Sequence, residues 1–341
     1  MDLINERKVR HLRIIESDPD SDRQRHCFDA IRLKHRALPE LNLADVDPSV
    51  EFMGKRLSFP LLISSMTGGD HDVLRRINRN LASAAEKAGV ALGVGSQRVM
   101  FTNPAARASF EVRPHAPTAL LFANLGAVQL NRGFGAEQCR EALMVAGADA
   151  LCLHLNPLQE AVQPKGDTDF AGLADKIGAV ARALDKPVVV KEVGAGISRE
   201  DAELLMAAGI RYVDVAGAGG TSWSRIEHHS LAEAENDHLG LVFQDWGTPT
   251  PDALRALQPC RDRLALIASG GLRNGIDMVK AMALGASLCG MAAPFLRPAM
   301  ESAEAVRAMV SRLKREFTTA LFLLGVRKAT DLIGNASVLR D

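Results

Sequence analysis

His154, Asn156, Gln159 and Glu160 form the densest group of residues in this sequence that could carry out chemistry. They follow directly on the apolar run 150–153. The side chains of His154 and Asn156 share one face of an extended chain, because successive residues of a strand alternate between its two faces. A lone histidine is usually structural. An imidazole, two amides and a carboxylate in so short a stretch favour a binding or catalytic site instead.

Lys191 is a second candidate, because it closes the otherwise apolar run 187–190. A charge at the end of a buried strand must face a pocket or meet a partner, since burying it alone costs too much free energy. The alternative to a pocket is a salt bridge with Glu192 or Asp214.

Three glycine-rich segments, 217–221, 269–273 and 290–293, each follow an apolar run late in the chain. Glycine lets backbone N–H groups approach an anion closely, and a helix start such as Asn274-Gly275 adds a favourable dipole. Together the segments predict a phosphate site, although each of them could serve only a tight turn. None follows a first strand in the GxGxxG form, which argues against a Rossmann nucleotide fold.

The N-terminal stretch holds a basic patch that includes Arg7, Lys8 and His11. On a helix, His11 shares a face with both Arg7 and Lys8 because residues three or four apart are neighbours. Such patches are usually solvated surface. If this segment folds over a pocket mouth, the patch becomes an anion clamp.

Short apolar runs alternate regularly with helical patterns along the chain, and these elements must position the residues described above. Helical patterns separate short apolar runs and often end in a glycine stop, which predicts parallel strands joined by right-handed crossovers. Eight such runs predict a closed (β/α)₈ TIM barrel, of α/β class, rather than an open sheet. The predicted strands are 61–65, 91–95, 119–123, 150–153, 188–191, 212–216, 264–268 and 287–291. The predicted helices are 71–88, 136–146, 170–184, 199–208, 250–258 and 275–284.

We expect one domain over residues 1–341, with residues 1–60 as an N-terminal extension to the active-site mouth and barrel floor. A short helix is predicted near 5–17, extended cover for the floor over 29–57, and an amphipathic tail over 301–324. The connection 98–118 shows no clear helix. The connection 217–249 is long enough to suggest a functional loop.

Composition bounds the partners of this 341-residue chain. Lys+Arg and Asp+Glu both total 41, so no bulk charge draws it to nucleic acid or to an anionic membrane. Five scattered cysteines without a CxxC pair favour a reduced, cytoplasmic setting, and Cys152 and Cys289 lie in apolar runs as expected of core thiols. We find no signal segment and no apolar run long enough to span a membrane.

The order and spacing of these residues closely resemble one family over nearly the whole chain: the type 2 isopentenyl-diphosphate isomerases, which are FMN-dependent barrels. The set Asn156, Gln159 and Glu160, together with the basic pair Arg7-Lys8, separates that family from other FMN barrels. The landmarks are Arg7-Lys8-x-x-His11, 65–69 (SMTGG), 95–98 (GSQR), 154–160 (HLNPLQE), 191–194 (KEVG), 216–223 (AGAGGTSW), 245–250 (DWGTPT) and 269–275 (SGGLRNG). His228-His229 departs from the pattern, which carries an arginine nearby, and Leu272 is a conservative change.

The resemblance implies a reaction and a role for each group. The reaction is isomerisation of isopentenyl diphosphate to dimethylallyl diphosphate with reduced FMN, Mg²⁺, NADPH or NADH as reductant, and no net redox change. The implied FMN contacts are Ser65, Met66, Thr67, Ser96, Asn124, Lys191, Thr221, Gly271, Leu272, Arg273, Ala292 and Ala293. The implied substrate contacts are Arg7, Lys8, Ser96, Gln97, Arg98, His154 and Gln159, and the implied catalytic set is Gln159, His154, Asn156 and Lys191.

Glu160 is the implied Mg²⁺ ligand, and Lys191 is implied to stabilise an anionic reduced ring. The family also implies a homotetramer or homo-octamer in the cytoplasm. Two rivals stay open: an FMN-dependent oxidoreductase of the 2-hydroxy-acid oxidase kind, and a non-catalytic phosphate- or flavin-binding barrel. The oxidase needs a histidine–arginine arrangement for a carboxylate, which we do not find convincingly in the sequence.

Overall fold

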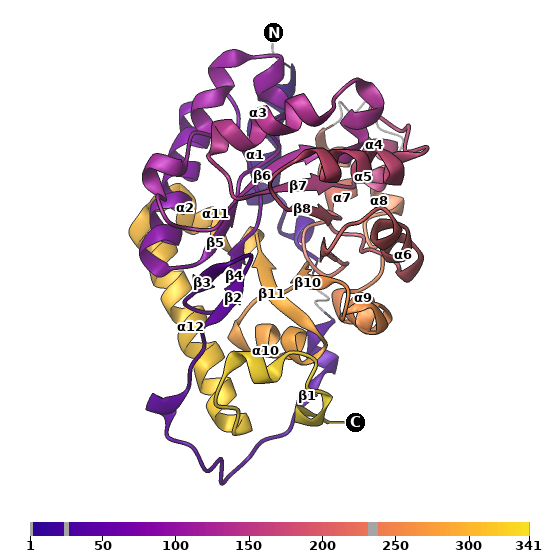
Figure 1. Ribbon diagram of the computed structural model, residues 1–341. Coiled ribbons are helices and arrows are strands. Elements are labelled where there is room, and N and C mark those ends of the chain that lie inside the picture. Colours follow the sequence, from indigo (N-terminus) through magenta and orange to yellow (C-terminus); the bar gives the residue numbers. More distant parts are fainter. Residues whose placement is uncertain (1–2, 24–26, 231–237, 341) are drawn as a thin grey trace.

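The computed structural model describes residues 3–23, 27–230 and 238–340. Eight parallel strands close into a barrel in chain order, with helices around it (Figure 1), which confirms the predicted fold class. The strands are β4 (Leu61–Ile63), β5 (Ala91–Gly93), β6 (Leu121–Gly126), β7 (Ala150–His154), β8 (Val188–Lys191), β9 (Tyr212–Asp214), β10 (Ala265–Ser269) and β11 (Ala286–Met291). All eight correspond to predicted runs, although β6 lies further along the chain than expected.

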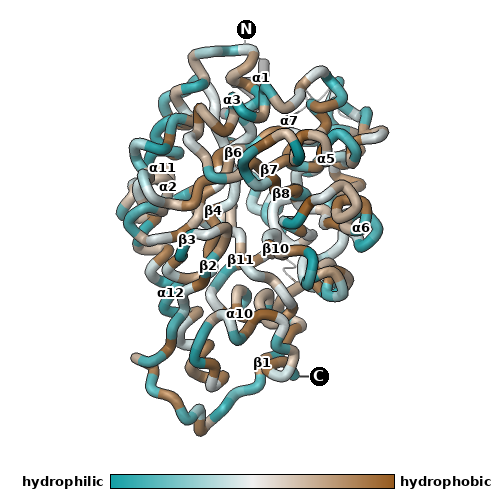
Figure 2. Tube along the Cα trace, viewed as in Figure 1, coloured by the Kyte–Doolittle hydropathy of each residue, from teal (hydrophilic) through white to brown (hydrophobic). Residues whose placement is uncertain are grey.

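Burial on both faces explains why these strands read as continuous apolar runs. Each residue of β4, β5 and β6 is buried, including Asn124 near the end of β6. Figure 2 shows hydrophobic segments at the centre of the molecule and hydrophilic ones along much of the outer rim. Cys152 and Cys289 lie in this core as predicted, and burial raises the pKa of the Cys152 thiol to about 12.

The predicted barrel helices are present with ends shifted by up to three residues. Their glycine stops act as expected: Gly89 takes the left-handed conformation (φ 65°) and donates to the carbonyls of Ala85 and Glu86. The α-helices are α1 (Leu3–Ser17), α2 (Asp72–Ala88), α3 (Ala136–Ala146), α4 (Pro157–Val162), α5 (Leu173–Ala183), α6 (Arg199–Ala207), α7 (Trp223–Ser230), α8 (Leu239–Val242), α9 (Thr250–Leu257), α10 (Gly275–Ala283), α11 (Ala293–Glu301) and α12 (Ala303–Leu324). In the described part of the chain, no helix is both long and apolar enough to cross a membrane.

The irregular connection between β5 and β6 holds short 3-10 helices in place of an α-helix, and its prolines remove N–H donors that a longer helix needs. Among the described residues, the 3-10 helices are Pro19–Ser21, Phe28–Ala30, Leu43–Asp45, Gln97–Phe101, Pro104–Ser109, Arg113–His115, Ala127–Arg132, Gln258–Cys260, Ala329–Leu332 and Ala336–Val338.

The segment expected as extended cover for the floor is partly helical and forms two short antiparallel pairs. β1 (Arg32–Leu33) pairs with β12 (Leu339–Arg340), and β2 (Val50–Phe52) pairs with β3 (Lys55–Leu57). Met53 and Gly54 both have positive φ at the β2–β3 turn, as a two-residue hairpin of this kind requires. Phe52 packs edge-on against Tyr212 at the start of β9, with 5.7 Å between ring centroids.

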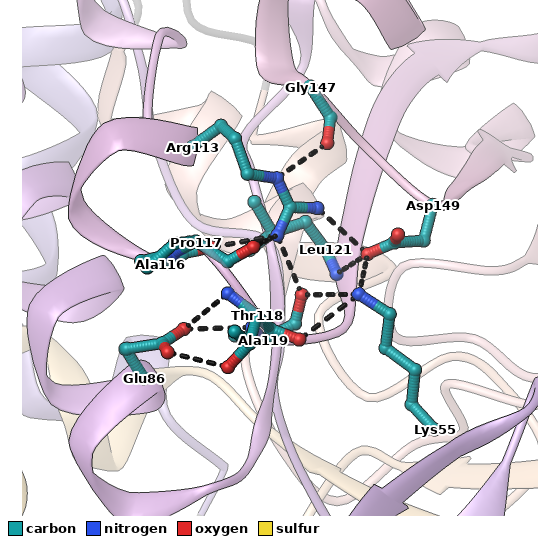
Figure 3. Close-up of polar contacts among 10 residues, drawn as sticks. All are labelled: Lys55, Glu86, Arg113, Ala116, Pro117, Thr118, Ala119, Leu121, Gly147 and Asp149. Carbon is teal, nitrogen blue, oxygen red and sulfur yellow. Dashed lines mark hydrogen bonds and ion pairs between the residues drawn. The ribbon is translucent and has the colours of Figure 1, made fainter.

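A polar cluster fastens this hairpin to the amino ends of β6 and β7 (Figure 3). One carboxylate oxygen of Asp149 accepts from Lys55 Nζ at 3.0 Å, from Arg113 Nη2 at 2.8 Å and from the Leu121 N–H at 2.9 Å. Burial alone would raise the pKa of Asp149, but the hydrogen bonds from Leu121, Lys55 and Arg113 hold it below its ordinary value. The charged carboxylate therefore stabilises the fold.

We expect Asp149→Ala to lower the free energy of unfolding by about 2–3 kcal/mol, because charged hydrogen bonds at a partly buried site are lost. Since the folded-state pKa is depressed, this contribution is present above the unfolded value and is lost as pH falls through the folded-state pKa. Urea unfolding at pH 7 and at low pH measures both effects. Glu203→Ala, in an exposed α6 ion pair, is the control and should cost under about 0.5 kcal/mol. Equal losses in the two variants would contradict the assignment.

Candidate active site

A cleft opens at the carboxyl ends of the strands, where active sites of closed parallel barrels lie. Lining residues come from the ends of all eight strands and from α1. Of the residues predicted for the site, the cleft brings together Lys8, Ser65, Met66, Thr67, Ser96, Arg98, Asn124, His154, Asn156, Gln159, Glu160, Lys191, Thr221, Gly271, Leu272, Arg273, Ala292 and Ala293.

Two predicted residues are not among that group. Gln97 is wholly buried behind the cleft wall, where its amide donates to the Ala142 carbonyl at 2.9 Å and accepts from the Asn124 N–H at 3.0 Å. The structure therefore does not bring Gln97 to the cleft, where a substrate contact was expected: both ends of its amide are held by the backbone, and it fixes Asn124. The side chain of Arg7 lies outside the described residues.

The contact between His154 and Asn124 assigns the tautomer of the histidine. Asn124 Nδ2 donates to the Val94 carbonyl at 3.2 Å, so its Oδ1 faces His154 Nδ1 at 2.8 Å as an acceptor. His154 therefore carries its hydrogen on Nδ1, and Nε2 is left as an acceptor. Burial, followed by the positive charges of Lys191, Lys8 and Arg98, lowers the pKa of His154 to about 3. The ring is neutral near pH 7.

Asn156, Gln159 and Glu160 form a chain of hydrogen bonds across the start of α4. Asn156 Nδ2 donates to Gln159 Oε1 at 3.2 Å and to Glu160 Oε1 at 2.9 Å. Gln159 Nε2 in turn donates to Glu227 Oε1 at 2.7 Å from α7. The orientations of both amides are therefore set, and the buried Oδ1 of Asn156 is left without a partner beside the cleft.

Lys191 faces the cleft and makes neither of the salt bridges considered from sequence. Its ammonium donates to the Glu192 carbonyl at 2.5 Å. The Glu192 carboxylate instead accepts backbone N–H groups, including those of Val193 and Gly194 at 2.6 Å each. Asp214 accepts from the Ser269 hydroxyl at 2.6 Å. With both carboxylates held elsewhere, the charge of Lys191 is available to the cleft.

The three glycine-rich turns line the cleft and approach one another: Gly271 lies against Gly219, and Gly290 lies against Ser269. Gly270 and Gly271 have φ of 94° and 86°, and a Cβ on Gly271 would stand 2.8 Å from the Gly219 carbonyl oxygen. Only glycine permits the turns after β9 and β10 to touch in this way. Thr250 Oγ1 fixes the turn after β10, because it donates to the carbonyls of Ser269 and Gly270 at 2.9 and 2.6 Å.

We call these three glycine-rich turns the cradle. The helix that presents its amino end to the cradle is α11, whose first residues Ala293 and Pro294 line the cleft. No side chain caps α11. The start of α10, predicted correctly at Asn274-Gly275, is already satisfied: Glu316 accepts the Gly275 N–H at 2.8 Å, and Asn274 caps the helix.

The donor set fits a flat, polar-edged ligand that carries a phosphate. The glycine turns and the α11 amino end suit a dianion. The buried hydroxyls of Ser64 and Thr67, which have no hydrogen-bond partner, lie at the ends of β4 beside the cleft and suit a heterocycle edge. No group of three or more histidine, cysteine or acidic residues in the described ranges forms a metal site.

Comparison with known proteins agrees with this geometry. Residues 16–123 and 154–340 match the FMN-dependent dehydrogenase family. A Paracoccus zeaxanthinifaciens protein named isopentenyl-diphosphate delta-isomerase is 56% identical over 98% of this chain and 97% of its own. Proteins of the same name from Hydrogenovibrio crunogenus and Methanosarcina mazei are 51% and 45% identical, covering 98% and 96% of this chain and 98% and 89% of their own.

The chain belongs to the isopentenyl-diphosphate delta-isomerase family. Solved structures with the same fold include a flavocytochrome b2 variant, with TM-score 0.70 and 18% identity over 97% of this chain and 82% of that one. A mandelate oxidase variant with a monooxide FMN adduct has TM-score 0.61 and 19% identity over 93% and 89% of the two chains. At such identities these two likenesses show the fold alone.

Several cleft residues of this isomerase-family chain were not predicted as site residues. Asp22 lines the cleft and pairs with Arg273, although 251 positions separate them. His11 and Trp223 also line it and meet edge to face, with ring centroids 5.5 Å apart. Sequence signals existed only for the last two, which belong to the family landmarks, because Asp22 reaches the site by a contact between distant segments.

The His228-His229 departure from the family pattern also finds a place in the structure. His229 Nε2 lies 3.1 Å from Asp18 Oδ2, and Arg225 donates to the same carboxylate at 2.6 Å. α7 therefore places a basic side chain, Arg225, against Asp18 of the N-terminal segment.

We expect the ring of His154 to stay neutral from about pH 5 to 8, where a free imidazole would titrate. Because its folded-state pKa is depressed to about 3, its contribution favours folding above the unfolded value near 6.5 and is lost as pH falls below it. Ring ¹⁵N shifts of the protein, with His154→Gln to assign the signals, measure this. An inflection of the assigned signal between about pH 5 and 7 would refute it.

Proposed function

We propose that this chain isomerises isopentenyl diphosphate to dimethylallyl diphosphate, using reduced FMN and Mg²⁺ with no net redox change. The observation that carries the proposal is the composition of the cleft at the carboxyl ends of the strands. Its lining combines the glycine-rich turns, which suit a phosphate, with cationic side chains, a neutral histidine and two oriented amides. The names of relatives at 45–56% identity support the same reaction.

FMN fits the cradle end of the cleft. Its phosphate would meet the turn at Gly271 and the amino end of α11, and the hydroxyl of Thr67 would meet the ring edge. Reduced FMN supplies an exchangeable proton at N5 and an electron-rich ring. Lys191, unpaired with any carboxylate of the described chain, would stabilise negative charge on the ring.

The remaining polar groups suit an alkene diphosphate better than a hydroxy acid. Lys8 and Arg98 place positive charge at the mouth for the diphosphate. His154 cannot act as a cation near neutral pH, and its Nε2 accepts hydrogen bonds. Gln159, held by Glu227, orients the alkene or relays the departing proton. Leu12, Ile15 and Met66 contribute apolar lining beside these groups.

Glu160 suits a Mg²⁺ ion that the substrate helps to hold. Its carboxylate is buried and accepts from Asn156, from Gln163 at 2.7 Å and from the Asp167 N–H at 2.7 Å. A carboxylate offers about four acceptor positions, so about one remains for a metal. Mg²⁺ usually keeps water and takes one or two carboxylates plus substrate phosphates. NADPH or NADH as reductant, the cytoplasmic location, the oligomer and the single domain stay predictions.

The decisive assay incubates the protein anaerobically with reduced FMN, Mg²⁺ and isopentenyl diphosphate in D₂O. We expect dimethylallyl diphosphate carrying solvent deuterium, no NAD(P)H consumption once the flavin is reduced, and little activity with oxidised FMN. Mass spectrometry of the released cofactor should give FMN. Stoichiometric NAD(P)H oxidation, or turnover of a 2-hydroxy acid in place of the diphosphate, would favour the oxidoreductase rival.

Lys8→Ala should weaken substrate binding about ten- to a hundredfold, because a charge-assisted bond to the diphosphate is lost. FMN content should not change, since Lys8 lies on α1 rather than at the cradle. Arg10→Ala is the matched control: Arg10 is on the same helix, is exposed, and donates to the Ser230 carbonyl. Titration of the reduced holoenzyme with substrate measures the difference. Loss of flavin from Lys8→Ala, or equal weakening in both variants, would overturn the role.

Glu160→Gln should raise the Mg²⁺ concentration needed for half-maximal activity, because a neutral amide is a poorer Mg²⁺ ligand. In the unsubstituted enzyme, Mg²⁺ affinity should be weak alone and should rise when inorganic pyrophosphate is present. Calorimetric titration of Mg²⁺ with and without pyrophosphate measures this. Tight binding to the free enzyme, or an unchanged Mg²⁺ requirement in Glu160→Gln, would contradict the metal role.

A further inference from the structure

Asp167 joins three side chains directly behind the cleft wall. Its Oδ2 accepts from Gln129 Nε2 at 3.1 Å and lies 2.8 Å from Arg98 Nη1, while its Oδ1 lies 3.0 Å from Arg132 Nε. Arg98 and Gln129 line the cleft, and Asp167 itself does not. The side chain of Asp167 is 14% exposed, which leaves it among these partners rather than in solvent.

The backbone at the same position reaches the predicted metal ligand. The Asp167 N–H donates to Glu160 Oε2 at 2.7 Å, and the preceding Gly166 lies against the Glu160 carbonyl, where a Cβ would collide with it. The chain that follows α4 thus turns back around Glu160. Asp167 therefore touches both the arginine and the carboxylate that the proposed function assigns to the diphosphate and its metal.

The pairing with Asp167 leaves most of Arg98 available. A guanidinium has five N–H donors in a rigid fork, and Asp167 engages Nη1 alone. Burial would raise the pKa of Asp167, but Gln129, Arg98 and Arg132 hold it below its ordinary value, so the carboxylate is charged.

We propose that Asp167 is a positioning residue that holds the guanidinium of Arg98 against the cleft wall with its remaining donors directed to the substrate diphosphate. The proposal rests on the proposed function for the identity of the anion. A long arginine side chain loses rotamer freedom when it binds, and a fixed partner removes that loss beforehand. Asp167 thereby acts on diphosphate affinity and not on the proton transfer.

The test is a double-mutant cycle on Asp167→Asn and Arg98→Ala in the FMN-loaded protein. Asparagine keeps the shape but removes the charge, so we expect about a tenfold rise in KM for isopentenyl diphosphate. The same rise is expected in the Kd of inorganic pyrophosphate with Mg²⁺, with kcat changed less than about twofold. In the Arg98→Ala background, Asp167→Asn should have no further effect, because the group through which it acts is gone.

Arg132→Ala is the matched control, because Arg132 meets the opposite oxygen of Asp167, is 51% exposed and does not line the cleft. It should change KM less than about twofold. If Asp167→Asn does not fold with FMN, Asp167→Glu keeps the charge, displaces the carboxylate by one methylene and enters the same cycle.

Additive effects of the two substitutions would overturn the proposal and point to Glu160 instead. A fall in kcat at constant KM would overturn it as well. Suppose that the wild-type protein binds pyrophosphate but makes no allylic product, and that the pyrophosphate Kd values of the variants show the coupling. This result would refute the proposed function and leave the positioning role intact. Product formation with an uncoupled cycle would do the reverse.

Discussion

The parallel register of the barrel strands is the constraint on which the rest of the structure depends. Gly126 pairs with His154, His154 with Lys191, and Lys191 with Asp214, across four neighbouring strands. Because parallel strands all end at the same rim, this register delivers the histidine and the lysine to one cleft. A slip of one residue would turn His154 to the other face of its strand. Gly126 takes part by its lack of a side chain, since a Cβ there would stand 3.3 Å from His154 Nε2.

That register also sets the electrostatics of the cleft in a chain whose formal net charge is zero. The carboxylates nearest Lys191 belong to Glu192 and Asp214, and both are held by backbone or hydroxyl donors. Burial, followed by the positive charges of Lys191, Lys8 and Arg98, depresses the pKa of His154. Bulk composition predicts no general affinity for polyanions, whereas the local arrangement favours the proposed site for a small anion.

Much of the fold could be predicted from sequence, because each barrel strand is buried on both faces and therefore apolar along its length. Glycine stops such as Gly89 marked helix ends by a local rule. The floor of the barrel was predicted less well. The β2–β3 hairpin forms because of its own turn. Its place on the barrel depends on the contact of Lys55 with Asp149, 94 positions away. No local pattern records such a pairing.

The same division holds in the site. Residues at or just beyond the end of a strand, such as Lys191 and Asn156, could be placed at the cleft because parallel strands of a barrel all end at the same rim. Gln97 also follows a strand, yet its side chain turns inward because Ala142 and Asn124 offer it partners. The position of a residue relative to a strand end predicts where its backbone lies. The available hydrogen-bond partners decide which way its side chain points.

The N-terminal segment is placed by contacts with distant parts of the chain. The Arg23 N–H donates to the Gly220 carbonyl at 3.1 Å, and the Ser222 N–H donates to the Ser21 carbonyl at 2.8 Å, so the segment lies along the turn after β9. The ion pair of Asp22 with Arg273 adds a link to the turn after β10. α1 ends just before this attachment, so contacts with the glycine turns determine where Lys8 stands over the cleft. The proposed cradle for the FMN phosphate and the proposed clamp for the diphosphate therefore belong to one hydrogen-bonded unit, built from segments about two hundred residues apart.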